Sequence, residues 1–116
     1  MIQHISAVTL TVRDMVRSVE FYRKLGFELL YGSESAAFSS LKAGEAIVNL
    51  VASETYEPKA WGRVIFRVDD GNAQYRTLQA HALAVESPQV APWGERFFHV
   101  VDPDGHELSF AELLLA

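Results

Sequence analysis

The first part of the chain has a pattern of apolar and polar positions that predicts a strand followed by a helix. In Ile5–Val12, every second residue from Val8 onward is valine or leucine, as on one face of an extended strand. Asp14 stands where an N-cap belongs, and Met15–Leu25 carries apolar residues at helical spacing. Gly26 then occupies the position at which a C′ glycine ends a helix.

Three short strand-like runs complete this first half. They are Phe27–Tyr31, Ala36–Leu41 and Ala46–Val51, with turns expected at Gly32-Ser33 and Ala43-Gly44. The next segment, Ser53–Lys59, is polar, contains a proline and has no periodicity. We therefore expect it to be a linker.

The same order of elements then recurs. The predicted elements are a strand at Arg63–Val68, an N-cap at Asp70, a helix at Ala73–Ala82 and strands at Leu83–Glu86, Phe97–Val101 and Glu107–Leu113. Ser87–Gly94 contains two prolines and is expected to be a connection, and Asp102-Pro103-Asp104-Gly105 has the residues of a type I turn.

The two halves are related by a fixed offset. Val12-Arg13-Asp14 aligns with Val68-Asp69-Asp70, and Leu10 aligns with Phe66, at a spacing of 56 positions. One such half cannot bury its own sheet face, so an internal repeat predicts two modules that form one unit. We expect a single domain over residues 1–116, with modules at 1–52 and 61–116 and a linker at 53–60.

Composition narrows the classes of protein. The chain has 116 residues, a net charge of −5 and no cysteine, which excludes disulfides, thiolate metal sites and a cysteine nucleophile. Lys and Arg do not cluster, so nucleic acid is not an expected partner. No apolar run approaches the roughly 20 residues that cross a membrane. No basic segment precedes the first apolar stretch, so we expect a cytoplasmic protein.

Two segments carry a family resemblance. Val8–Asp14 (VTLTVRD), followed by Phe21-Tyr22 and Leu25-Gly26-Phe27, resembles the opening of the vicinal oxygen chelate superfamily. Trp93–Phe98, through Asp102–His106, resembles its closing hairpin. The superfamily includes glyoxalase I, extradiol dioxygenases, fosfomycin-resistance transferases and bleomycin-resistance proteins. The resemblance implies an α+β fold in which two tandem βαβββ modules form an incompletely closed eight-stranded barrel around a cleft, and it implies a homodimer.

The same resemblance identifies the positions at which metal-dependent relatives hold a divalent cation. In those relatives the cation chelates two substrate oxygens. The four positions are occupied here by Ala7, Asn49, Arg63 and Ser109. A methyl group cannot coordinate, a guanidinium repels a cation, and neutral amide and hydroxyl groups are weak donors. We therefore expect neither a tightly bound metal nor another cofactor.

Strand parity suggests which polar residues face the cleft. Thr9, Arg63 and Glu107 should point inward, where Arg63 either pairs with Glu107 or binds a carboxylate or phosphate of a ligand. His99 lies three residues before Asp102, where the resembling fosfomycin-resistance enzymes carry a substrate-contacting tyrosine. Hairpin pairing should bring His99 close to Ser109, either as a site residue or as a satisfied barrel histidine.

Aromatic residues supply further candidates. Most are expected in the core, but Trp61, Trp93 and Phe97 are candidates for the walls of a ligand site, as in bleomycin-binding relatives. The other three histidines are interpreted as structural. Of these, His81 should lie at a helix end, and His106 should be exposed after the turn.

Three functions remain open from the sequence. The first is a protein that binds a small, partly aromatic or cationic molecule without a metal, as bleomycin-resistance proteins do. The second is a metal-dependent lyase or dioxygenase of the glyoxalase type. The third is a metal-free enzyme that uses His99 or Glu107 as acid or base. Missing metal ligands, abundant aromatic residues and negative charge favour the first.

Overall fold

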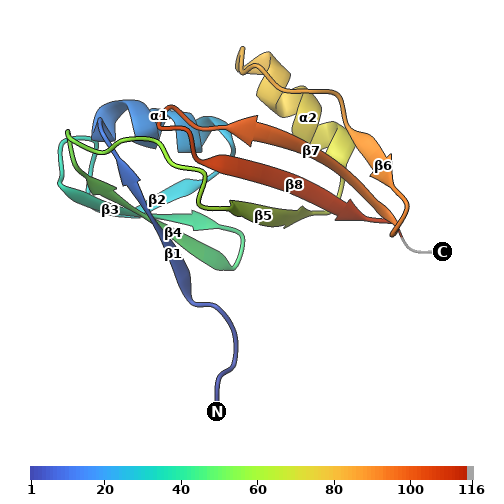
Figure 1. Ribbon diagram of the computed structural model, residues 1–116, viewed down its shortest axis with the longest axis horizontal. Helices are drawn as coiled ribbons and strands as arrows, with labels where there is room; N and C mark the ends of the chain where they lie inside the picture. The colour runs from blue at the N-terminus through green and yellow to red at the C-terminus, as the bar shows by residue number, and fades with distance from the viewer. Residues whose placement is uncertain (115–116) are drawn as a thin grey trace. The chain divides into compact units, whose positions relative to one another are not determined.

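The computed structural model describes residues 1–114 and contains two βαβββ modules (Figure 1). The elements are β1 (Ala7–Val12), α1 (Met15–Lys24), β2 (Glu28–Tyr31), β3 (Phe38–Ala43), β4 (Ala46–Ala52), β5 (Arg63–Val68), α2 (Gly71–Ala80), β6 (Gln89–Ala91), β7 (Glu95–Val101) and β8 (Glu107–Leu113). The strands form two four-stranded sheets, ordered β1-β4-β3-β2 and β5-β8-β7-β6, and no closed barrel. The predicted α+β fold with tandem βαβββ modules is confirmed.

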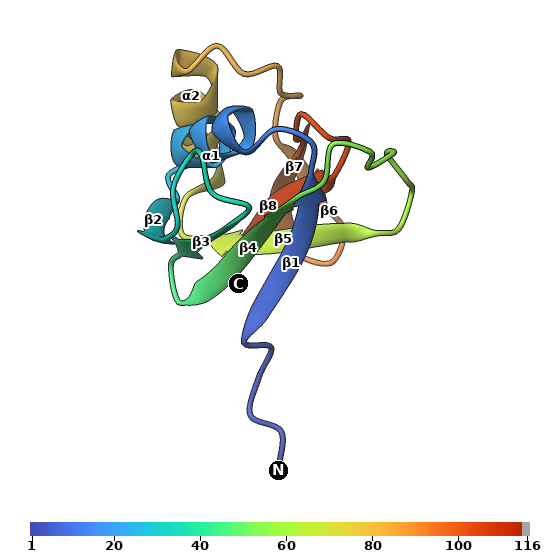
Figure 2. The same ribbon diagram turned by 90° about the vertical axis from the view of Figure 1, so that its left-hand side faces the viewer.

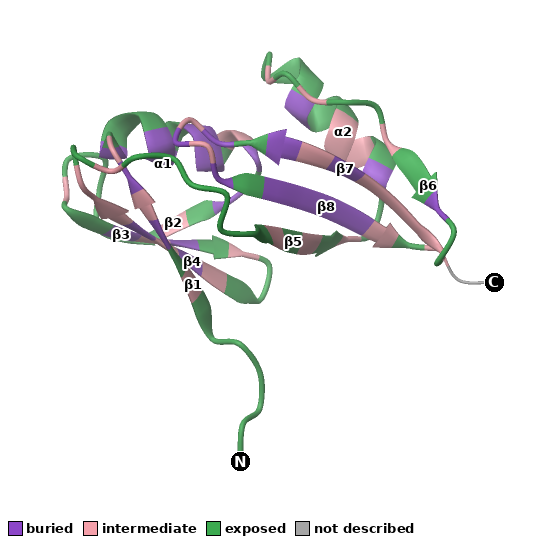
Figure 3. Cartoon of the chain, viewed as in Figure 1, coloured by how far each residue is buried: buried purple, intermediate pink, exposed green. Residues whose placement is uncertain are grey.

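Contacts within the chain separate two compact units, Met1–Pro58 and Lys59–Ala116. In the first unit α1 lies over one face of the sheet and contacts β4 (Figure 3). Val19 of the helix and the strand residues Leu41 and Leu50 are fully buried. Strand β1 begins at Ala7 and not at the predicted Ile5, because Ile5 belongs to an exposed N-terminal segment (Figure 2). No helix within residues 1–114 is long and apolar enough to span a bilayer.

The second unit repeats the design of the first. Central strand β8 pairs in parallel with β5 and antiparallel with β7. Phe98 and Phe110 stack at 5.3 Å between ring centroids on the face covered by α2, and Tyr75 of that helix meets Phe98 edge-on at 5.7 Å. Asp14 and Asp70, related by the offset of 56, both cap the N-termini of their helices.

The two helices also end in the same way. Gly26, with φ of +102°, and Ala82, with φ of +60°, occupy equivalent C′ positions. In each case the next backbone N–H bonds back over the last turn, from Phe27 to the Tyr22 carbonyl at 3.1 Å and from Leu83 to the Leu78 carbonyl at 3.1 Å. This is the Schellman motif, which places C′ in the left-handed region that favours glycine.

One predicted strand is wrong. We expected Leu83–Glu86, but the second strand of the second module is β6, Gln89–Ala91, inside the predicted connection. The hairpin to β7 closes where the Gly94 N–H donates to the Ala91 carbonyl at 3.0 Å, so pairing starts there. The pairing ends at Gln89, which follows Pro88 in the chain. Helix α2 also begins two residues before the predicted Ala73.

The turn after β7 is folded inward. The Gly105 N–H donates to the Asp102 carbonyl at 3.0 Å, as predicted for this turn. The Asp102 carboxylate accepts from the N–H of Asp104 at 2.9 Å and of His106 at 2.8 Å. His106 is only 3% exposed, so its predicted exposure is wrong. Its Nδ1 accepts from the indole of Trp61 at 2.9 Å, which shields the imidazole from water.

The helix ends allow a matched test of backbone strain. Ala82→Gly should raise the free energy of unfolding by about 1 kcal/mol, because a left-handed alanine is strained and glycine is not. Gly26→Ala should lower it by a similar amount. Ala80→Gly, at the last residue of α2, is the control and should be slightly destabilising, since glycine weakens a helix. Urea unfolding followed by circular dichroism measures all three, and a destabilising Ala82→Gly would contradict this account.

The Asp102 turn makes a second stability prediction. Asp102→Ala should lower the free energy of unfolding by about 2–3 kcal/mol, because it leaves two buried N–H groups without their carboxylate acceptor. Asp102→Asn keeps one acceptor oxygen and should cost clearly less. The same unfolding experiment applies, and equal losses for the two variants would show that the acceptor is not what matters.

Candidate ligand-binding site on the second sheet

The second sheet presents one face away from α2. Strand alternation sends Phe98, Val100 and Leu108 into the core and turns their neighbours to the opposite face. That face collects most of the residues predicted to form the site, namely Arg63, Phe97, His99, Glu107 and Ser109, and it adds Ile65.

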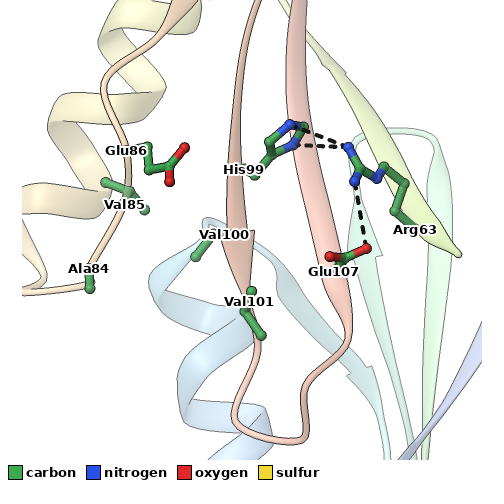
Figure 4. Close-up of a pocket in the computed structure, with 8 residues that line it drawn as sticks. All are labelled: Arg63, Ala84, Val85, Glu86, His99, Val100, Val101 and Glu107. Atoms are coloured by element: carbon green, nitrogen blue, oxygen red, sulfur yellow. Dashed lines mark hydrogen bonds and ion pairs between the residues drawn. The ribbon is translucent and has the colours of Figure 1, made fainter. Parts of the chain in front are cut away.

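Four polar side chains form a connected row across this face, and Figure 4 shows three of them, Arg63, His99 and Glu107. His99 Nδ1 lies 2.6 Å from Ser109 Oγ, and Arg63 Nη1 lies 3.3 Å from His99 Nε2. Arg63 Nη2 pairs with Glu107 Oε2 at 3.6 Å. The register explains the row, because Arg63 is opposite Glu107 and His99 is opposite Ser109 in the two ladders around β8.

The ion pair within this row is solvated. The side chains of Arg63 and Glu107 are 41% and 53% exposed, so their attraction is worth at most about 1 kcal/mol. The pair therefore contributes little to folding. Its effect is to orient the guanidinium of Arg63, which lines both neighbouring cavities.

Two cavities meet at this row and share Arg63 and His99. One has a volume of about 620 Å³ and extends past Glu107 and Val101 to Glu86. In Figure 4 the Glu86 side chain points across this space toward His99. The other has a volume of about 280 Å³ and is lined chiefly by Ile65, Trp93, Phe97 and Ser109. A charged compartment and an aromatic compartment thus lie side by side.

The aromatic compartment has a flat wall. The rings of Trp93 and Phe97 stack at 6.3 Å with an angle of 17°, and Phe97 lies 5.3 Å from the His99 ring. The indole of Trp93 donates to Glu95 Oε1 at 2.7 Å, which fixes an indole whose residue is 70% exposed. Trp61 lines neither cavity, because its indole is bonded to His106.

The first sheet carries a neutral counterpart of the polar row. The Asn49 amide donates to Thr9 Oγ1 at 3.3 Å, and its carbonyl accepts from Ser40 Oγ at 2.6 Å. Thr9 is opposite Asn49 just as Ile65 is opposite Ser109, so Asn49 and Ser109 occupy equivalent points of the two sheets. Both remaining candidates of the first module, Thr9 and Asn49, are therefore engaged with each other.

The positions that hold a cation in metal-dependent relatives do not fit one. Ala7 offers a methyl group, and Asn49 uses its amide in two hydrogen bonds. Arg63 places a positive charge there, and Ser109 is bonded to His99. Within residues 1–114, no group of three or more histidine, aspartate or glutamate side chains is arranged to hold a metal ion. The residues present do not supply a divalent site.

Sequence reasoning missed two residues of this face and its cavities. Glu86 was predicted to lie in a strand. Pairing of β6 with β7 reaches only Gln89, so Glu86 lies outside the sheet and lines the cavity that His99 also lines. Glu95 was overlooked, although it accepts from Trp93 and pairs with Arg67 at 3.2 Å. Its even spacing from Phe97 and His99 was an available signal, because residues two apart share a strand face.

Comparison with known proteins gives a consistent result. The chain is 27% identical over 102 residues to the bleomycin resistance protein of Klebsiella pneumoniae, covering 80% of this chain and 79% of that one. A bleomycin resistance determinant encoded on transposon Tn5 has the same fold, with a TM-score of 0.82 at 24% identity over 97% of this chain and 100% of that one. A bleomycin-binding protein complexed with bleomycin gives 0.79 at 23% identity, over 96% and 98%.

The sequence profile of one family covers most of the chain. The profile of the Glyoxalase/Bleomycin resistance protein/Dioxygenase superfamily matches residues 2–110. The resemblance noted in the sequence is therefore confirmed, and the chain is a bleomycin-resistance-like member of this superfamily, the vicinal oxygen chelate superfamily.

Proposed function

We propose that the protein binds a partly aromatic, cationic small molecule on the second sheet, without a metal and without changing it chemically. One observation carries the proposal: an aromatic cavity adjoins a cavity with more negative than positive charge. The stacked rings of Trp93 and Phe97 suit a planar apolar group. Glu86 and Glu107 outnumber Arg63, so the adjoining cavity suits a positive group.

The relatives support a ligand of this kind. One similar structure is a complex with bleomycin, and the curated relative is a bleomycin resistance protein. Bleomycin is therefore the first ligand to test. The residues at the family's metal positions support binding over metal-dependent catalysis, because a guanidinium and a methyl group stand where cation ligands are required.

Trp93 provides the test of the binding site. Isothermal titration of bleomycin should give measurable binding to the native protein, and Trp93→Ala should weaken it about 10-fold through lost stacking. Trp61→Phe is the matched control. It removes an indole outside both cavities, so affinity should change less than about twofold even if stability falls. Absence of binding, or equal loss in both variants, would refute the proposed site.

The metal positions provide a second test. Protein dialysed against metal-free buffer should hold far less than one divalent ion per chain, as measured by plasma mass spectrometry. Its affinity for bleomycin in metal-free buffer should be unchanged by EDTA, because the protein contributes no cation to the site. Stoichiometric zinc, nickel, manganese or iron that survives dialysis and disappears in Ser109→Ala would replace the binding proposal with a metal-dependent one.

A further inference from the structure

Strand β7 has an outer edge that is only partly covered. β6 pairs with its first residues, at Ala91↔Glu95, Val90↔Arg96 and Gln89↔Phe97. β7 continues four residues further, to Val101. Among the described residues, no strand lies along the outer edge beyond Phe97. The uncovered edge borders the cavity of about 620 Å³, which includes His99, Val100 and Val101 in its lining.

The direction of the backbone groups on this edge follows from one hydrogen bond. The Asp102 N–H, directly after β7, donates to the His106 carbonyl at 3.0 Å, so it points toward the β8 side. Backbone groups of successive strand residues point to opposite edges. Those of His99 and Val101 therefore point away from β8, into the gap left by β6. An unpaired strand edge is a template for another extended chain.

A carboxylate stands across this gap. The segment Ala84–Glu86 runs along the other side of the cavity, held off β7 because the ladder stops next to Pro88 (Figure 4). Glu86 is exposed and has no salt bridge among the described residues. The notch between Ala84–Glu86 and the edge of β7 thus combines backbone donors and acceptors with negative charge.

We propose that this notch binds a cationic, peptide-like portion of the ligand, whose amides pair with His99 and Val101 and whose positive group lies near Glu86. This assignment rests on the proposed function and makes it more specific: the ligand has an aromatic part against Trp93 and an amide-bearing, positively charged part in the notch. Addition of an extended segment to a free strand edge is an established mode of recognition, with main-chain bonds supplying affinity.

The free protein gives the first readout. In amide exchange followed by NMR, the N–H groups of Phe98 and Val100 should be protected, because they point toward β8. Those of His99 and Val101 should exchange rapidly. Slow exchange at His99 and Val101 without ligand would overturn the proposal, because the edge would already be paired.

The second readout uses a capped tripeptide, acetyl-Val-Lys-Val-amide. At about 10 mM, a concentration that reveals millimolar affinity, it should shift the amide signals of His99 and Val101 and slow their exchange. An analogue with an ester in place of the lysine N–H should bind at least about threefold more weakly, since it lacks one donor. No shift at these residues, or equal binding of the ester, would overturn the proposal.

The third readout tests the charge. Glu86→Gln should weaken the lysine peptide about threefold to tenfold and leave a norleucine analogue unaffected. Glu45→Gln is the matched control, because it removes the same charge from an exposed turn of the first sheet. Equal effects of the two substitutions would show general attraction and would overturn the role of Glu86.

The two proposals fail in distinguishable ways. Trp93→Ala should leave tripeptide binding unchanged, because Trp93 does not line the notch. If the tripeptide binds at His99 and Val101 but bleomycin does not bind, the proposed function loses its support and the notch proposal is retained. A third outcome would refute the notch alone. In that outcome bleomycin binding depends on Trp93, but bleomycin does not shift the amide signals of His99 and Val101, and Glu86→Gln does not weaken its binding.

Discussion

The register of β8 with its two neighbours is the constraint on which the site depends. Its alternate residues divide between two tasks: Leu108 and Phe110 fill the core beneath α2, and Glu107 and Ser109 face outward. Parallel pairing with β5 sets Arg63 beside Glu107, and antiparallel pairing with β7 sets His99 beside Ser109. A slip of one residue would bury a carboxylate and expose a phenylalanine, so the core enforces the geometry of the polar row.

Much of the fold could be predicted from the sequence because the two halves repeat. Local signals mark three of the four helix ends. The side chains of Asp14 and Asp70 cap the starts of α1 and α2, and Gly26 ends α1 in the left-handed conformation. The wrong strand at Leu83–Glu86 has a non-local cause, since the hairpin with β7 decides where pairing begins. The burial of His106 was equally invisible, because it depends on Trp61, which is 45 positions away in the sequence.

The site was predictable where strand parity governs it. Arg63 with Glu107, and His99 with Ser109, follow from alternation and hairpin pairing. Trp61 shows the limit of this reasoning, because it lies two residues before β5, where strand alternation does not orient a side chain. Glu86 shows another limit: its position depends on a connection without regular structure, whose course the flanking packing sets.

The neutral row of the first sheet has a consequence for how such a protein diversifies. Thr9, Asn49 and Ser40 satisfy one another with three uncharged side chains, whereas the equivalent row of the second sheet contains a guanidinium and a carboxylate. Of two repeated modules, one can thus keep a self-contained neutral row while the other carries charge. Substitutions in the charged row can then alter the electrostatics of the second sheet while the hydrogen bonds of the first stay intact.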